Sequence, residues 1–586
     1  MSEEQELLKE WCDRLVSLQI TEWNDKEFYG GIMCPSCGRI HGRCSDAMYP
    51  MMYMAKETGD SKYLDCARRL FAWSSNMFRR DGCCYNDTNS NWRGITVFSE
   101  IQLGEALLAF GDLLDKEEYT VWKDRFQEMA DYLYLHIEEI GGNINYPITC
   151  AYAMAVAAKL LKDKKYSQKG RTLAVFGADH ITEDGLLYGE GKKREAVSPK
   201  GCRPVDLGYN VEESLPALLQ YAVMEEDEEI YQKAKSALKT HLEFMLPDGA
   251  WDNSWGTRNN KWSYWGSRTS DGCQAGFGIL AAEDAQCSEA FRRNTGLLRR
   301  CTKDGLLYGG PMFVSEEEPA CVHHTFCHVK SLATFLHRKD TLQPPSSLPS
   351  DTRDGLHYYP SVHVGLIGTG GWRATVSDYD VEYSKRGHAT GGAVTLLWHK
   401  DLGPVFAGTM GDYQLVEPNN MQLTRNGEPK CQTPRISYQG EEGETYENIN
   451  DLTAKVSYQE QPEQIRVQAE GVLRTGKQEG TCKFQVQYEF AEDKVCWNVT
   501  SCDYDAVFYL PVVSECTETV TADGNQLRIQ RANGKTLCIQ ADARILVETD
   551  SYYKGRMFNP VGGMQALDCR IRLKKGVPVS IQMTEE

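Results

Sequence analysis

The chain has 586 residues, 41% hydrophobic and 25% charged, which is the composition of a folded globular protein and excludes a disordered or fibrous one. Its formal net charge of −19 excludes broad nucleic-acid binding, a function that needs a basic surface. No apolar run is long enough to cross a bilayer, so we expect no membrane partner.

Cysteine usage and the N-terminal composition indicate the compartment. The 21 cysteines are odd in number and scattered through predicted helices and strands, unlike a disulfide framework. Residues 1–6 are acidic and lack the basic start and apolar stretch of a secretory signal. We therefore expect a cytoplasmic protein with mostly free thiols.

A short theme recurs six times over the first 340 residues. Each copy has a turn of two small or acidic residues, a few apolar residues, a polar loop and an apolar helix. The segments 184–189 and 304–309 have the same six residues. Gly in these turns reaches positive φ at little steric cost. The apolar helices are expected at 46–58, 96–113, 146–161, 211–224, 273–282 and 325–336.

Amphipathic helices follow these apolar ones, for example at 61–78, 116–137, 228–245 and 288–301. Helices that are apolar all round belong inside a fold, and one-sided helices belong outside. Residues 1–340 are thus predicted to form an (α/α)6 toroid. An open α-solenoid is the alternative. Closure is favoured because the polar loops precede one helix of each pair, which gathers them at one mouth.

The composition changes after the last helix. Residues 341–351 form a Pro/Ser linker, and residues 352–586 are predicted to form an antiparallel β-sandwich domain. Its strands, separated by Gly, Asn and Asp turns, are expected at 392–399, 464–472, 482–490, 495–500, 506–513, 526–530 and 577–583.

A cysteine-rich segment lies in the first polar loop. Cys34, Cys37, His41 and Cys44 have a spacing that could bind a structural zinc. The alternative is that the thiols pack inside the protein while His41 and Arg43 face a ligand. No other cofactor is expected to be required.

The mouth of a closed toroid would gather the inner-helix N-termini, whose free N–H groups suit a carboxylate ligand. Loop tips are usually polar, but here many polar side chains share one predicted rim, which favours a site. They are His41, Arg43, Asp46, Arg93, Ser99, Glu100, Asn145, Tyr146, Tyr152, Tyr209, Asn210, Glu212, Glu213, Arg268, Asp271, His323, His324 and His328.

Residues 250–272 form the richest loop. It carries four tryptophans, a tyrosine, two arginines, a lysine and two aspartates. Trp faces stack on sugar rings and Arg forks bind carboxylates, so this composition is typical of a site for an acidic sugar. The alternative is a loop that folds on its own aromatics. The predicted substrate-binding residues are His41, Arg43, Asn210, Trp255, Arg258, Lys261, Trp265, Arg268 and His324.

Four segments carry a family resemblance. The toroid-plus-sandwich layout, with residues 388–404, resembles heparinase II/III-like lyases and related uronic-acid-specific hydrolases. Residues 34–44, 251–272 and 323–328 are similar to glycoside hydrolase family 154, a β-glucuronidase family. The resemblance implies an enzyme that degrades glycans containing uronic acid.

Two mechanisms fit these residues. An exo-acting hydrolase needs two carboxyl groups across the scissile bond, and the candidates are Glu213, Asp271 and Asp252, with Glu212 and Asp46 behind them. A lyase neutralises the uronate carboxylate and removes the proton from C5 with Tyr or His. Its candidate neutralising groups are Asn210, Arg43 and Arg268, and its candidate bases are Tyr264, His323 and His41.

We favour the β-glucuronidase-like hydrolase, because of the resemblance and because an intracellular enzyme would trim imported oligosaccharides from their ends. The lyase is the alternative, and a non-catalytic carbohydrate-binding homologue is the third hypothesis. The expected partner is an acidic oligosaccharide, with Tyr383, Lys385, Arg386 or His388 of the β-domain reaching the mouth. The sequence leaves open a homo-oligomer, the uronic acid and the linkage.

Overall fold

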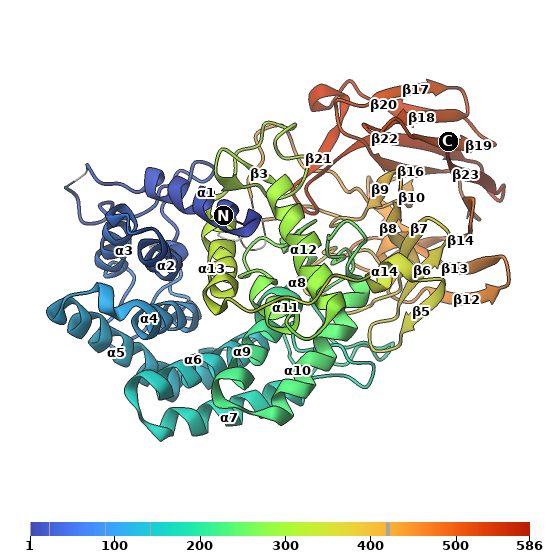
Figure 1. Cartoon of the computed structure of the whole chain (residues 1–586). Helices are drawn as coiled ribbons and strands as arrows, with labels where there is room; N and C mark the ends of the chain where they lie inside the picture. Colours follow the sequence, from blue (N-terminus) through green and yellow to red (C-terminus); the bar gives the residue numbers. More distant parts are fainter. Residues whose placement is uncertain (1, 23, 88–89, 141, 416, 418–421) are drawn as a thin grey trace.

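A computed structural model describes residues 2–22, 24–87, 90–140, 142–415, 417 and 422–586 (Figure 1). Its N-terminal part is a ring of helix pairs, and its C-terminal part is built of strands. The inner helices are α2 (Met48–Thr58), α4 (Thr96–Phe110), α6 (Asn145–Leu161), α9 (Leu215–Glu225), α11 (Gln274–Leu280) and α13 (Val322–Arg338). The outer helices are α1 (Glu3–Leu18), α3 (Ser61–Ser74), α5 (Lys116–Ile140), α7 (Lys164–Ala178), α10 (Glu228–His241) and α12 (Ala285–Arg300).

The ring is closed. Each inner helix contacts the next one in chain order, and α13 packs back against α2. The outer helix α1 comes first in the sequence but packs on α13, the last inner helix. The first and last helices of the ring therefore form its sixth helix pair (Figure 1). The predicted toroid is therefore confirmed, and the open α-solenoid is wrong.

Short turns join inner to outer helices on the side away from the mouth. Three of these turns use one device, in which a left-handed residue ends the inner helix and the following Asp caps the outer helix. The Asp side chain accepts a hydrogen bond from a backbone N–H of the new helix, which satisfies a donor that has no partner within the helix. The three turns are Gly59-Asp60, Lys162-Asp163 and Glu226-Asp227.

The C-terminal part is a β-sandwich. A short helix, α14 (Pro349–Thr352), leads into an antiparallel five-stranded sheet of β5 (Gly355–Tyr359), β6 (Val364–Thr369), β7 (Trp372–Ser377), β8 (Ala393–His399) and β9 (Gly403–Ala407). Large apolar side chains of this sheet, including Trp372 and Phe406, share a core with Phe484, Trp497 and Ile581 of a second sheet. The predicted sandwich is confirmed.

The second sheet has fourteen strands among the described residues. Its main path runs β17-β18-β19-β23-β15-β14-β13-β11-β10-β16-β22-β20, with β12 paired to β13 and β21 to β22. Burial alternates along β15, as expected for a strand with one face in the core. The strands are β10 (Arg435–Gln439), β11 (Thr445–Glu447), β12 (Lys455–Gln461), β13 (Gln464–Arg474), β14 (Gly480–Ala491), β15 (Lys494–Ser501), β16 (Ala506–Val513), β17 (Thr519–Asp523), β18 (Gln526–Gln530), β19 (Thr536–Ala541), β20 (Ile545–Glu548), β21 (Met557–Asn559), β22 (Met564–Leu573) and β23 (Val579–Glu585).

The tryptophan-rich loop lies between the two parts. It contains the two-residue strands β1 (Trp262–Ser263) and β2 (Gly266–Ser267), and Tyr264 N–H donates to the carbonyl of Gly562 over 3.1 Å. Ser254 Oγ donates to Thr395 Oγ1 over 2.9 Å, so the loop also binds the five-stranded sheet. This loop fastens the toroid to the sandwich.

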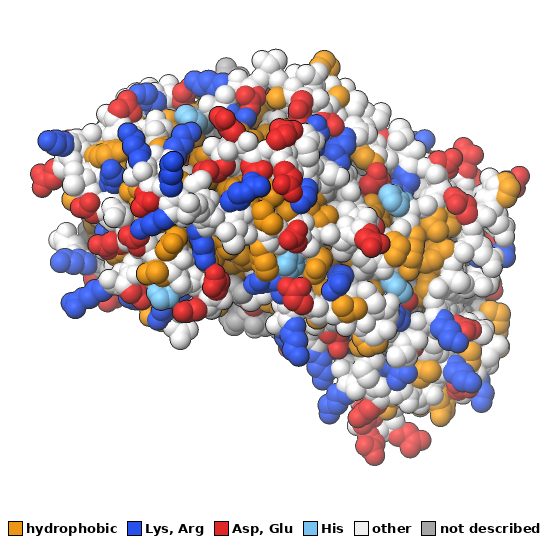
Figure 2. Space-filling model, turned by 90° about the horizontal axis from the view of Figure 1, so that it is seen from below, with side chains coloured by type: hydrophobic (Ala, Val, Ile, Leu, Met, Phe, Trp, Pro, Cys, Tyr) orange, Lys and Arg blue, Asp and Glu red, His pale blue; other side chains and the backbone are white. Residues whose placement is uncertain are grey.

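Two further features concern the surface charge and the helix lengths. Basic and acidic side chains are interspersed over the face drawn in Figure 2, as expected for a chain that carries both signs. Among the described residues, no helix combines the length and the apolar character needed to cross a bilayer.

A glycine pair tests the packing of the ring. A Cβ at Gly104 of α4 would lie 2.4 Å from Phe126 of α5 and 2.4 Å from Val156 of α6, so Gly104→Ala should lower the free energy of unfolding by about 1–3 kcal/mol. Gly296→Ala in α12 meets only Arg300, at 3.7 Å, and should raise it by up to about 1 kcal/mol through helix propensity. Denaturant unfolding measures both, and equal effects would contradict this packing.

Candidate active site

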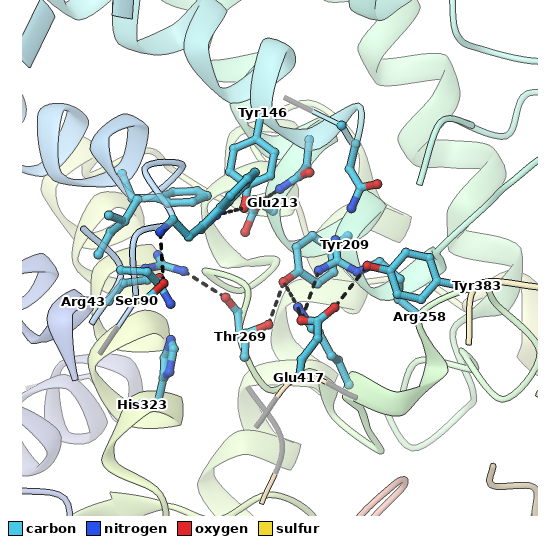
Figure 3. Close-up of a pocket in the computed structure, with 18 residues that line it drawn as sticks. Arg43, Ser90, Tyr146, Tyr209, Glu213, Arg258, Thr269, His323, Tyr383 and Glu417 are labelled. Carbon is cyan, nitrogen blue, oxygen red and sulfur yellow. Dashed lines mark hydrogen bonds and ion pairs between the residues drawn. The ribbon is translucent and has the colours of Figure 1, made fainter. Parts of the chain in front are cut away.

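A cavity of about 420 Å³ opens where the polar loops meet at the mouth of the ring (Figure 3). All six inner helices, or the loops before them, contribute to it, and the sandwich part adds two side chains. The lining residues are Arg43, Asn86, Ser90, Trp92, Ile95, Phe98, Gly142, Asn143, Asn145, Tyr146, Tyr209, Glu213, Arg258, Lys261, Thr269, His323, Tyr383 and Glu417. The expectation that the inner-helix N-termini share one mouth therefore holds.

One corner of the cavity is built to hold an anion. Lys261 Nζ lies 2.6 Å from Glu417 Oε2, Tyr383 donates its hydroxyl to the same carboxylate over 3.1 Å, and Arg258 Nη2 is 3.9 Å away. The Glu417 carboxylate comes from the sandwich part and is held by two cations and a phenol hydroxyl of the cavity. Arg258 is fixed from behind by Glu190, at 2.9 Å.

Tyr209 forms the floor of this corner. The guanidinium of Arg258 lies over its ring, 4.0 Å from the centroid, and Lys261 Nζ donates to its hydroxyl over 3.1 Å. The hydroxyls of Tyr209 and Thr269 are 2.7 Å apart. Burial raises the pKa of Tyr209 above its usual value although Arg258 opposes the shift, so the phenol is protonated at neutral pH.

Glu213 and Asn145 form another wall. Glu213 lies in a π-helical turn, η3 (Asn210–Ser214), at the start of α9, and π turns often occur at functional sites. Asn145 Nδ2 donates to Glu213 Oε1 over 2.5 Å. Burial raises the pKa of Glu213 to about 8, and the charge of Asp271 adds to the shift while Arg43 opposes it. Glu213 is thus a neutral hydrogen-bond donor at pH 7.

Arg43 belongs to a buried charge network at the cavity edge. It donates to Asp46 over 2.7 Å, to Asp271 over 2.5 Å and to the carbonyl of Thr269 over 2.9 Å. Lys330 holds the other Asp271 oxygen at 2.7 Å. Burial acts to raise the pKa of Asp271, but Lys330 and Arg43 together lower it, so Asp271 is an ionised partner of these cations.

His323 lies near Arg43, from the first turn of α13 (Figure 3). Its Nε2 is buried and has no hydrogen-bond partner among the described residues. Burial, together with the charges of His41 and Arg43, holds the pKa of His323 well below its usual value. The imidazole is therefore neutral, with a nitrogen available to accept a proton.

Five of the residues predicted for catalysis or substrate binding line the cavity: Arg43, Glu213, Arg258, Lys261 and His323. Of the four β-domain residues expected to reach the mouth, Tyr383 does. Asn145, Tyr146 and Tyr209 of the predicted rim also line it.

Three predicted residues of the tryptophan-rich loop lie elsewhere because the loop packs between the two parts of the protein. Asp252 accepts from Ser254 and Thr375, Tyr264 donates to Asp248 over 2.9 Å, and Arg268 donates to the carbonyl of Pro560. The structure does not bring Asp252, Tyr264 or Arg268 to the cavity.

The predicted stacking residues Trp255 and Trp265 are fully buried and present no face to a sugar. Trp255 packs against Phe244, with the ring centroids 5.3 Å apart. Trp265 packs edge-on against His328 at 4.6 Å. The structure therefore does not bring either ring to the cavity, and a buried interface loop can have the same aromatic composition as a sugar site.

The remaining expected residues are also outside the cavity. Asn210 donates to the carbonyl of Leu187 over 2.7 Å, and His324 packs against Trp265. Asp271 serves the charge network described above. His41 lies in a cluster with Cys34 and Cys37, as predicted, but the fourth member of that cluster is Cys321 and not the predicted Cys44.

Sequence reasoning missed Trp92 and Glu417. Trp92 is 41% exposed, lines the cavity and donates its Nε1–H to the Tyr146 hydroxyl over 3.0 Å. Its position in a polar loop before an inner helix was the signal that could have found it. Glu417 lies between β9 and β10 of the sandwich part, and no sequence pattern links it to the mouth.

Comparison with known proteins decides the family. Residues 8–354 match the ulvan lyase N-terminal domain, and residues 356–585 match the ulvan lyase C-terminal domain. The chain belongs to the ulvan lyase family. It is 37% identical over 580 residues to a broad-specificity ulvan lyase of Formosa agariphila, which covers 96% of this chain and 90% of the relative.

Solved structures share the fold. Heparinase III has a TM-score of 0.58 at 12% identity, with 100% of this chain and 85% of that chain covered. Chondroitin AC lyase from Streptomyces coelicolor A3 has a TM-score of 0.53 at 11% identity, with 99% and 79% covered. The heparinase-like fold implied by the resemblance is confirmed. The family match overturns the expected glycoside hydrolase and the assignment to family 154.

The pKa of Glu213 predicts a pH effect on stability. A folded-state pKa of about 8, above the usual value of about 4.5, means that the folded protein binds more protons than the unfolded chain between these pH values. The contribution to stability is complete below about pH 4.5 and is lost as the pH rises through about 8. Thermal unfolding from about pH 5 to 8 should show a smaller loss of Tm for Glu213→Gln than for the wild type. Parallel curves would contradict the assignment.

Proposed function

We propose that the protein is a polysaccharide lyase that cleaves ulvan, or a related uronic-acid polysaccharide, by β-elimination. The observation that carries the proposal is a carboxylate position beside a protonated tyrosine: Lys261 Nζ contacts both Glu417 Oε2 and the Tyr209 hydroxyl. The similarity to a broad-specificity ulvan lyase supports the substrate class.

The first step is charge neutralisation. The uronate carboxylate displaces that of Glu417 and binds Arg258, Lys261 and the Tyr383 hydroxyl. Cations in a buried site stabilise the negative charge that develops on the carboxylate as the proton leaves C5. The low dielectric around the buried Arg258 and Lys261 side chains makes this interaction stronger than it would be in water.

The second step moves two protons. Neutral His323 accepts the C5 proton on Nε2, the C–H electron pair forms the C4–C5 double bond, and the bond from C4 to the glycosidic oxygen breaks. Tyr209 donates its hydroxyl proton to the leaving oxygen, and Lys261 and Thr269 stabilise the tyrosinate. Return of the proton from His323 to Tyr209 restores both groups.

The other walls bind the sugar. The exposed ring of Trp92 supplies a face for stacking, and Asn145 and neutral Glu213 supply hydrogen bonds to hydroxyl groups. Among the described residues, the carboxyl groups that line the cavity are those of Glu213 and Glu417, and Glu417 is paired with cations. The pair of free carboxyl groups that hydrolysis needs is therefore not assembled.

Incubation with ulvan tests the reaction class. β-Elimination yields an unsaturated uronate that absorbs in the ultraviolet, whereas hydrolysis yields saturated sugars that do not. We expect ultraviolet absorbance to rise with the wild type. His323→Ala and Tyr209→Phe should each lower kcat about 10²- to 10⁴-fold, because each removes a proton-transfer group.

Tyr146→Phe is the matched control. Tyr146 lines the same cavity, but its hydroxyl accepts from Trp92, so this variant should keep kcat within about tenfold of the wild type. New reducing ends without absorbance would contradict the lyase. Loss of turnover in Tyr146→Phe with retention in Tyr209→Phe would contradict the assignment of the acid.

A substitution of Glu417 tests where the substrate carboxylate binds. Glu417→Gln keeps the shape of the side chain but removes the charge that competes for Lys261 and Arg258. We expect KM for the polysaccharide to fall several-fold while kcat stays nearly constant, since the ground state loses a competitor. Glu428→Gln, on the same segment but outside the cavity lining, is the control. An unchanged or raised KM for Glu417→Gln would place the substrate carboxylate elsewhere.

A further inference from the structure

A second cluster of reactive side chains lies outside the cavity lining. Its members are Cys34, Cys37 and His41 from the first loop of the ring and Cys321, the residue that precedes α13. The four ligand atoms all lie within 4.8 Å of one another, although Cys321 is 280 residues from His41 in sequence. The fold therefore brings together three thiols and an imidazole from the beginning and the end of the toroid sequence.

The distances fit a tetrahedral metal site. Cys321 Sγ lies 3.8 Å from Cys34 Sγ, 3.8 Å from Cys37 Sγ and 3.7 Å from His41 Nε2. A zinc ion with bonds of about 2.3 Å to sulfur and about 2.0 Å to nitrogen gives tetrahedral edges of about 3.8 Å for S–S and about 3.5 Å for S–N. The observed separations are close to these edges.

The local backbone supports thiolate ligands. The chain turns back between Cys34 and Arg39, where the Cys34 N–H donates to the Arg39 carbonyl over 2.9 Å. The Cys37 N–H donates to Cys34 Sγ over 3.4 Å, and such bonds favour the charged form of sulfur. Cys34, His41 and Cys321 are buried, and only Cys37 lies at the surface.

Two alternatives to this metal site fit the structure less well: a disulfide between these cysteines, and a metal bound at a nearby group of carboxylates. A disulfide needs an S–S distance of about 2.05 Å, far shorter than the 3.8 Å between these sulfurs. A group of Asp46, Asp271 and Cys327 also has metal-ligand spacing, but there Arg43 and Lys330 already neutralise the carboxylates. The cysteine cluster has no comparable cation from a Lys or Arg bound to its sulfurs among the hydrogen bonds of the described residues.

We propose that Cys34, Cys37, His41 and Cys321 bind one structural Zn²⁺ that fastens the first loop of the ring to the start of α13. Three thiolates and one imidazole complete four-coordination and leave no open position, as in structural rather than catalytic zinc sites. Soft sulfur ligands favour zinc over calcium or magnesium.

The site has a consequence for the cavity. Arg43 follows His41 by two residues, and His323 follows Cys321 by two, so the metal holds both cavity residues from behind. Zinc thus acts as a positioning element for Arg43 and His323 and takes no part in proton transfer. Metal content does not depend on the reaction that the enzyme catalyses, so the zinc site can be tested separately from the lyase.

Metal analysis of the 586-residue protein, purified without chelators, tests the site. We expect about one zinc per wild-type chain and near-complete loss in Cys321→Ser and Cys37→Ser. Cys44→Ser is the matched control, since Cys44 is a buried cysteine of the same segment that lies outside the cluster, and it should keep about one zinc per chain.

Cobalt substitution provides a readout for variants that fold poorly. The Co²⁺ form of the wild type should show thiolate charge-transfer bands and the visible bands of a tetrahedral ion, and Cys44→Ser should retain them. Less than a tenth of a zinc per wild-type chain, a Cys34–Cys37 disulfide found by mass spectrometry, or zinc lost from Cys44→Ser but kept in Cys321→Ser would each overturn the proposal.

Discussion

The packing of α13 against α2 is the contact on which the rest of the structure depends, because it closes the ring. Closure brings His323 and Arg43, 280 residues apart in sequence, to the edge of one cavity. It also lets α1 complete the outer layer beside α13. An open superhelix of the same helices would spread these side chains along a groove.

The second constraint is electrostatic. Under the proposed function, a chain with a net charge of −19 binds an anionic substrate, so cations have to be concentrated where that substrate binds. Arg258 and Lys261 are both buried, and each is paired with a carboxylate, Glu190 or Glu417. Pairing offsets the cost of burying the charges. In the proposed mechanism the substrate carboxylate replaces Glu417, which comes from the separate sandwich part.

Much of the fold could be predicted from the sequence because its signals are local. Helices such as α6 are apolar on every side, and the recurring turns mark where each hairpin begins. The position of the mouth could be predicted from the same periodicity, and this placed Glu213 and His323 at it before the structure did. These features depend on neighbouring residues rather than on contacts between distant segments.

The rest of the site depends on long-range packing. Trp255 and Trp265 have the composition of a sugar site, but the sandwich part covers their loop, and nothing within the loop reveals this. Cys321 replaces Cys44 in the cysteine cluster because α13 returns to the first loop, a contact that spacing cannot show. The reaction class was missed because the same arginines, tyrosines and carboxyl groups serve hydrolases and lyases alike.

The most direct test of this account is a crystal structure of an inactive variant with a uronate oligosaccharide bound. The account predicts the uronate carboxylate between Arg258 and Lys261, with C5 facing His323 Nε2 and the glycosidic oxygen facing the Tyr209 hydroxyl. A glycosidic oxygen flanked instead by Glu213 and a second carboxyl group, with the uronate carboxylate away from both cations, would contradict it.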